Sequence, residues 1–168
     1  MTSIVDIEGI GSQYGDKLKA MGIATVEALL EKGSTVAGRK ALAEQSEISA
    51  KLILRWVNHA DLFRIKGVAG QYAELLEAAG VDTVVELAKR NAQNLFHAMV
   101  ACNEEKNLVR VTPAQSRVEE WVAHAISLPR VVKYWVVAAS SRIVAYGGGG
   151  GVSRGKHNGI AGSNNGAG

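Results

Sequence analysis

The segment IEGIGSQYGDKLKAMGIATVEAL, Ile7 to Leu29, recurs 58 residues later as IKGVAGQYAELLEAAGVDTVVEL, Ile65 to Leu87. Ten of the 23 aligned positions are identical, and the alignment needs no gap. A repeat of this length indicates that one structural unit has been duplicated. In each copy a glycine stands two residues after an isoleucine, and a pattern typical of a helix follows.

A second, shorter similarity marks the end of each unit. ILRWVNHADL (Ile53–Leu62) aligns with VEEWVAHAISL (Val118–Leu128) at an offset of 65 rather than 58. The second unit is therefore longer between its glycine turn and its last helix. We divide the chain into units of about residues 3–62 and 63–130, within one domain that spans residues 1–134.

Capping residues predict where helices begin and end. Gly22 and Gly80 stand where a helix ends in a left-handed residue, and Thr25 and Thr83 follow as N-caps. Further helices are expected to begin at Ser34 or Thr35, at Ser49, and at Thr112 with Pro113 and Gln115. The composition before residue 130, rich in Ala, Leu, Glu and Lys, also favours helix.

The sequence changes character after Tyr134. Residues 147–168 include 10 glycines among 22 residues, so residues 135–168 are predicted to form a disordered, Gly-rich C-terminal tail. Within it, the apolar stretch WVVAASSRIVAY (residues 135–146) is compatible with either a short helix or a short strand.

The net charge of +3 comes from the C-terminal segment. All 16 acidic residues precede residue 121, and 16 of the 19 Lys and Arg residues precede Tyr134, so the body of the chain is neutral. A neutral body supplies no strong electrostatic argument for nucleic acid. The single cysteine, Cys102, excludes an intramolecular disulfide and is expected to be a buried apolar residue.

The glycine turn of the first unit has the features of an anion site. Gly9 and Gly11 can adopt positive φ without a Cβ penalty, and Ile10 between them is expected to point into the core. The next helix should begin near Ser12, and its first backbone N–H groups have no partner within the helix. Such groups hold a phosphate without reading a base.

This pattern resembles the helix-hairpin-helix motif. The residues that carry the resemblance in the first unit are Ile7, Gly9, Ile10, Gly11, Gly15 and Leu18. The resemblance implies a DNA-backbone site in which Gly9, Gly11 and Ser12 donate to a phosphate and Lys17 or Lys19 adds positive charge. Together with Ile10, these are the predicted nucleic-acid-binding residues.

Residues 3–134 as a whole resemble a bacterial family described as a domain of unknown function, DUF4332. The segments that carry this resemblance are KLKAMGIATVEALLEKG, GRKALAEQSEIS, WVNHADLFRIKGV, YAELLEAAGVDTVVELAKRN and LPRVVKY. It implies an all-α fold of two tandem helix-hairpin-helix units packed as one domain. It implies no activity, and the Gly-rich tail departs from the family.

The second copy departs from the DNA-binding pattern. Ala69 stands where the second hairpin glycine is expected, although Gly70 follows it. The next helix carries Glu74 and Glu77 and no lysine, and two carboxylates repel a phosphate. We therefore predict that only the first hairpin binds an anion, with help from Lys66.

Several other residues have both a structural and a functional interpretation. Tyr14 and Tyr72 are expected to pack as wedges rather than stack on bases, and Trp56 and Trp121 to lie in the core. His59 and His124 are expected to be capping or core residues rather than metal ligands, since no carboxylate or cysteine stands at ligand spacing. One further surface, formed by Arg39, Lys40, Lys51 and Arg55, has a modest basic bias that suits a nucleic-acid backbone.

No catalytic motif or cofactor fingerprint occurs, so we expect a non-enzymatic protein without a cofactor or metal. Two functions stay open: a sequence-independent nucleic-acid-binding module, whose partner is the backbone of double-stranded DNA, and a protein-interaction or scaffold module. No signal peptide and no run of about 18 apolar residues is found, so a cytoplasmic location without a membrane partner is expected.

Overall fold

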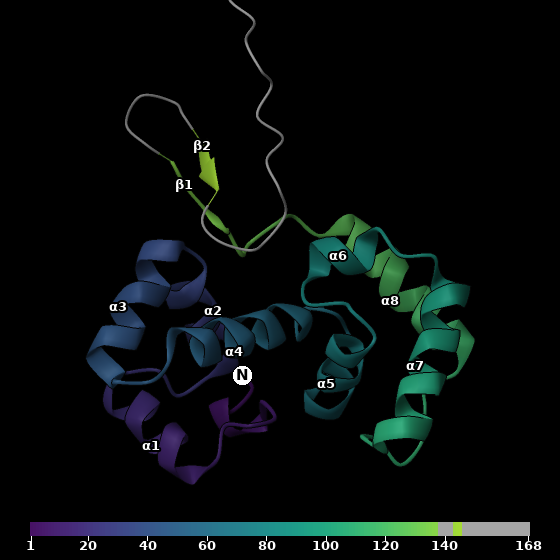
Figure 1. The fold of residues 1–168 in the computed structure, drawn as a ribbon, viewed down its shortest axis with the longest axis horizontal. Coiled ribbons are helices and arrows are strands. Elements are labelled where there is room, and N and C mark those ends of the chain that lie inside the picture. Colours follow the sequence, from purple (N-terminus) through teal and green to yellow (C-terminus); the bar gives the residue numbers. More distant parts are fainter. Residues whose placement is uncertain (138–142, 146–168) are drawn as a thin grey trace, which may run out of the picture.

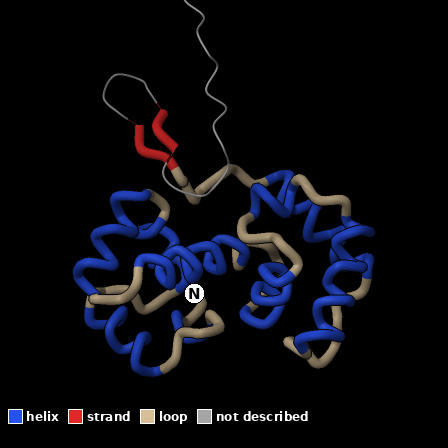
Figure 2. Tube along the Cα trace, in the orientation of Figure 1, coloured by secondary structure: helices blue, strands red, loops and turns tan. Residues whose placement is uncertain are grey.

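A computed structural model describes residues 1–137 and 143–145 of the chain. The described part contains eight α-helices, one 3₁₀ turn and one pair of short strands, which confirms the predicted all-α fold (Figures 1 and 2). The Gly-rich segment for which disorder is predicted lies outside the described residues, except for the strands.

The first unit consists of a 3₁₀ turn and four helices. Their bounds are η1 (Ile4–Asp6), α1 (Ser12–Ala20), α2 (Val26–Gly33), α3 (Val36–Ser46) and α4 (Ala50–Leu62). The segment before α2 lies beside the N-terminus, because Ile4 N–H donates to Ala24 O at 3.0 Å and Val26 N–H donates to Thr2 O at 2.9 Å. These bonds fix η1 against the start of α2.

The second unit consists of four helices. Their bounds are α5 (Gly70–Ala78), α6 (Val84–Ala88), α7 (Ala92–Lys106) and α8 (Gln115–Ser127). Each unit has its own cluster of buried apolar residues, and the side chain of Phe63 packs against both clusters. Trp56 and Trp121 are each 1% exposed, which confirms that both indoles lie in the core.

The helix boundaries follow the predicted capping residues with one exception. Thr25, Thr35, Ser49 and Thr83 cap α2, α3, α4 and α6 through their side-chain oxygens. Gly22 and Gly80 have φ of 81° and 92°, as expected for the left-handed residue after a helix. The prediction for α8 is wrong in detail, because its N-cap is Ala114 and no side chain caps the helix.

Helix α4 joins the two units. From its middle and second half, Arg55 Nε donates to Glu77 Oε1 at 3.1 Å, and His59 Nε2 is hydrogen-bonded to Glu77 Oε2. Two residues after His59, the buried carboxylate of Asp61 accepts from Val84 N–H at the start of α6. Polar contacts from one helix of the first unit therefore reach two helices of the second.

The segment after α8 returns to the first unit. Arg64 donates to Pro129 O at 2.7 Å, and Lys133 N–H donates to Ser34 O at 2.8 Å. Val132 is buried among the apolar residues of the first unit. The segment then forms β1 (Trp135–Val137), which pairs antiparallel with β2 (Ile143–Ala145) and lies next to α3 (Figure 1). The described residues of the stretch left open by the sequence thus form two short strands.

No helix among the described residues is long and apolar enough to span a membrane.

Candidate anion-binding site

The first hairpin, Ile7–Ser12, is a tight turn that leads into α1. Gly9 has a φ of 92°, which confirms the need for glycine there, and Ile10 N–H donates to Ile7 O at 3.1 Å. Gly11 does not use the conformational freedom that the sequence allows it: its φ of −77° and ψ of −176° are extended values that any residue adopts. A Cβ on Gly11 would meet no atom within 4 Å.

The start of α1 leaves donors open to solvent. Gly15 N–H donates to Gly11 O at 2.8 Å and closes the first turn. In the described part of the chain, the backbone N–H groups of Gly11, Ser12 and Gln13 have no hydrogen-bond partner, and no side chain caps the helix. All three residues are exposed. The arrangement presents bare donors at the positive end of the helix dipole.

The remaining residues around the first hairpin are structural. Ile10 is 4% exposed, so its side chain belongs to the core and only its backbone reaches the surface. The ring of Tyr14 packs against Trp56, with centroids 5.1 Å apart and planes tilted by 59°. Tyr72 and Trp121 repeat this pair at 5.4 Å and 54°. The wedge role predicted for both tyrosines is confirmed.

The two predicted lysines lie away from the open donors. Lys17 and Lys19 are exposed and stand in the last turn of α1. At 1.5 Å of rise per residue their Cα atoms are about 7–11 Å along the axis from Ser12, so only the flexible side chains bring charge toward the turn. Asp16, on the same helix, is also exposed.

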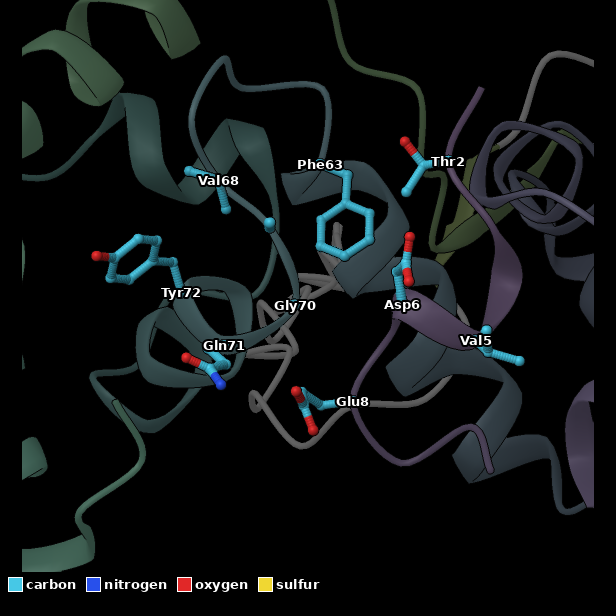
Figure 3. Close-up of a pocket in the computed structure, with 10 residues that line it drawn as sticks. Thr2, Val5, Asp6, Glu8, Phe63, Val68, Gly70, Gln71 and Tyr72 are labelled. Carbon is cyan, nitrogen blue, oxygen red and sulfur yellow. The ribbon is translucent and has the colours of Figure 1, made fainter. Parts of the chain in front are cut away.

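A cavity of about 490 Å³ separates the first hairpin from the start of α5 (Figure 3). Asp6 and Glu8 lie on one wall, Gly70 and Gln71 lie on the other, and the ring of Phe63 stands between them. Gly70 is buried, and a Cβ there would lie 2.3 Å from the carbonyl oxygen of Asp6. The first residue of α5 is therefore covered by the first unit, unlike the first residue of α1.

The second hairpin, Ile65–Gly70, repeats the backbone of the first. Gly67 has a φ of 91°, and Ala69 is extended with φ −124° and ψ −175°. Ala69 is therefore not a defect, because no glycine is needed at this position. Gly70 does not replace the second hairpin glycine either, since it is the first residue of α5. A glycine is needed there because a side chain would clash with the carbonyl oxygen of Asp6.

The two repeated histidines have different surroundings. His59 is fully buried, which confirms its core position, and it binds Glu77. Burial raises the pKa of the Glu77 carboxyl, but the hydrogen bond and charge of His59, with those of Arg55, outweigh burial and hold that pKa below its usual value. His124 is only partly buried and accepts a hydrogen bond of 3.2 Å from Lys66 N–H through Nδ1.

Of the four residues predicted to form a basic surface, Arg39, Lys40, Lys51 and Arg55, only the two lysines are exposed and without an ion-pair partner among the described residues. Arg39 is 8% exposed and donates to Gly33 O at 2.8 Å and to Lys133 O at 2.6 Å, so it is a structural residue. Arg55 is paired with Glu77. Lys40 and Lys51 are exposed. The prediction was wrong for the arginines because Lys133, which binds Arg39, and Glu77, which binds Arg55, lie 94 and 22 residues away in the sequence.

Cys102 is only partly buried, and its Sγ lies 3.4 Å from Ala78 O. The sequence-based expectation of a buried apolar cysteine is therefore met only in part.

A sequence model of the family described as "Domain of unknown function (DUF4332)" matches residues 8–128. This range covers the second hairpin, the first hairpin except Ile7, and all helices from α1 to α8. No curated protein and no solved structure matches the chain.

Proposed function

The chain belongs to the DUF4332 family, for which no activity is described, and on this premise we propose that it is a non-enzymatic cytoplasmic module that binds the backbone of double-stranded DNA through its first hairpin. The observation that carries the proposal is the set of unpartnered N–H groups at Gly11, Ser12 and Gln13. Gly9, in its left-handed conformation, forms the turn that leads into these exposed residues.

The charge distribution sets the expected strength of binding. Lys17 and Lys19 add positive charge from the far end of α1, whereas Glu8 and Asp16 oppose it. Binding should therefore be weak, because few phosphates are contacted and no base edge is read, and it should fall as salt rises, because each phosphate contact releases counterions.

Gly11 offers a matched set of variants for testing the proposal, since a side chain there meets no neighbour. Gly11→Asp places a carboxylate over the donors as an N-cap, Gly11→Asn caps them without charge, and Gly11→Ala leaves them open. A fluorescent duplex is titrated with the full chain between about 50 and 200 mM salt, where phosphate contacts dominate the change in affinity.

We expect wild type and Gly11→Ala to bind alike, Gly11→Asn to bind more weakly, and Gly11→Asp to lose at least about tenfold in affinity. The double variant Lys17→Glu/Lys19→Glu should flatten the salt dependence. Two duplexes of unrelated sequence should give the same result. The C-terminal cations Arg142, Arg154 and Lys156 are present in every variant, so they cannot produce a difference between variants. Equal binding by all Gly11 variants would remove the hairpin from the interaction.

A protein-interaction module is the second candidate. It is favoured by the neutral body and by the carboxylates of Asp6 and Glu8 in the cavity between the units, which disfavour a polyanion. If neither duplex binds at low salt, this function replaces the first. Cross-linking of the chain to a protein partner, lost on Asp6→Lys and Glu8→Lys, would then support it.

A further inference from the structure

We propose that the second unit contains a separate phosphate-binding pocket, formed around Gly67 by the side chains of Lys66 and Arg117, with the indole Nε1 of Trp121 next to the glycine. This site goes beyond the proposed function, because it shares no residue with the first hairpin and relies on side chains rather than on helix-terminal N–H groups.

The pocket is a cavity of about 510 Å³ between the second hairpin and α8. Its lining residues are Lys66, Gly67, Arg117, Glu120 and His124. Neither Lys66 nor Arg117 forms an ion pair with any described residue, and both are exposed. Two cations face one carboxylate, so the lining has a positive balance that suits an anion.

The indole of Trp121 supplies an unused donor at the same place. The ring is 1% exposed, and its Nε1 is buried with no hydrogen-bond partner among the described residues. This Nε1 lies 3.3 Å from the point where a Cβ on Gly67 would stand, and Arg117 Nη2 lies 2.7 Å from that point. A buried N–H without a partner is unfavourable, and an oxygen atom between it and the guanidinium would satisfy both.

His124 holds the two walls of the pocket together. Its Nδ1 accepts from Lys66 N–H at 3.2 Å, so the ring proton of the neutral form is on Nε2. The bond ties the hairpin to α8 and keeps Lys66 near Arg117. His124 also lines the cavity and adds a further donor to it.

The pocket belongs to the second unit alone. The repeat places Glu8 at the position of Lys66 and Leu52 at that of Arg117. The first unit therefore has the glycine and the tryptophan but not the cations. In the sequence, Glu77 is a carboxylate close to the second hairpin and is expected to repel an anion. In the structure its carboxylate is bonded to Arg55 and His59 of α4.

A phosphate group fits these donors because its several oxygens can accept from a planar guanidinium, an ammonium and an N–H at once. The group can come from a nucleic-acid backbone or from free phosphate, and the two sources share this chemistry. The test therefore uses both as probes.

The first experiment follows backbone and indole N–H signals of the full ¹⁵N-labelled chain by NMR while inorganic phosphate replaces chloride at constant ionic strength. We expect saturable shifts of the Trp121 indole and the Gly67 amide. Lys66→Gln and Arg117→Gln should each weaken binding about tenfold, and Glu120→Gln should strengthen it. Lys51→Gln, which removes an exposed charge on α4, is the matched control and should change nothing. The Lys66 variant keeps the test valid if Arg117→Gln does not fold.

The second experiment titrates a short duplex under the same conditions. Loss of the duplex-induced Trp121 shift in Arg117→Gln identifies the backbone as the source, whereas shifts with inorganic phosphate alone identify a free phosphate. Gly11→Asp, which blocks the first hairpin, should leave the Trp121 shift intact, so failure of one site is distinguishable from failure of the other. No shift at Trp121 with either probe, or equal shifts in all variants (an adventitious ion only), overturns the proposal.

Discussion

The carboxylate of Asp61, at the end of α4, accepts a hydrogen bond of 2.8 Å from the backbone N–H of Val84, the first residue of α6. Its second oxygen accepts from Arg64 at 2.8 Å, and Arg64 in turn holds Pro129 O. The last helix of the first unit thus caps a helix of the second. The repeat places Ile126, which is 67% exposed, at the position of Asp61, so this link exists once.

We expect Asp61→Ala to lower the free energy of unfolding by about 3 kcal/mol, because it leaves Val84 N–H and Arg64 without their acceptor. Urea unfolding followed by circular dichroism measures the change. Asp6→Ala, which removes an exposed carboxylate, should stay within about 0.5 kcal/mol of wild type. Equal effects of the two substitutions would show that Asp61 does not couple the units.

Local features of the fold could be predicted from the sequence, because they depend on residues close to one another in the chain. The N-caps Thr25 and Thr83 act within one helical turn, and the buried face of α4 follows its helical spacing. The duplication adds a second copy of each signal. For that reason the all-α fold, the wedge tyrosines and the core tryptophans were predicted successfully.

Contacts between distant segments could not be predicted. Arg39 looks like a surface cation until its bond to Lys133, 94 residues away, is known. Arg117 lies in α8, but its guanidinium is next to Gly67 of the second hairpin. A count of the charges on α5, the helix that follows this hairpin, therefore leaves Arg117 out. The sequence allows positive φ at both Gly9 and Gly11 and does not tell them apart, whereas in the structure Gly9 has that conformation and Gly11 is extended.

The two glycines of the first hairpin should therefore respond differently to alanine. Gly9→Ala forces an L-residue to a φ of 92° and should cost about 1–2 kcal/mol of stability. Gly11→Ala should lie within about 0.5 kcal/mol of wild type, because its backbone is extended and open. Thermal unfolding of the two variants provides the comparison. A larger loss for Gly11→Ala would contradict the geometry of the turn.

The carboxylate of Glu77 should make stability depend on pH. Burial raises its pKa, but His59 and Arg55 outweigh burial and lower it overall, so the folded chain favours the ionised form. The resulting stabilisation is present above the ordinary pKa of glutamate, about 4.3, and is lost as pH falls through the lower folded value. Urea midpoints between about pH 3 and 6 should therefore fall less steeply with acid in Glu77→Gln than in wild type.

Asp82 supplies the opposite sign as a control. Burial raises its pKa, and the charges of Glu86 and Glu77 raise it further. The fold disfavours the ionised form of Asp82. The resulting destabilisation begins to appear as pH rises through the ordinary pKa of aspartate, about 3.9, and it is absent in acid, where the carboxyl is protonated. Asp82→Asn should increase stability at neutral pH and steepen the loss in acid. Parallel curves for wild type and both variants would refute this account of the two carboxyls.

The returning C-terminal segment should depend on Arg39. Its guanidinium donates to Gly33 O and Lys133 O and lies 5.7 Å from the centre of the Tyr134 ring. Burial raises the pKa of the Tyr134 hydroxyl, which stays protonated and donates to Asn58 Oδ1 at 2.6 Å. Arg39→Gln should therefore cost about 3 kcal/mol, since two charge-assisted hydrogen bonds are lost in a nearly buried site.

The same substitution should also release the segment from the first unit before the helices unfold. Hydrogen exchange of the full chain measures this, because the Lys133 N–H that binds Ser34 O should lose protection in Arg39→Gln. The neighbouring exposed residue gives a matched control: Lys40→Gln removes a charge of the same sign and should leave both stability and exchange unchanged. Unchanged protection of Lys133 in Arg39→Gln would mean that the burial of Val132 and the bond of Tyr134 to Asn58 anchor the segment without Arg39.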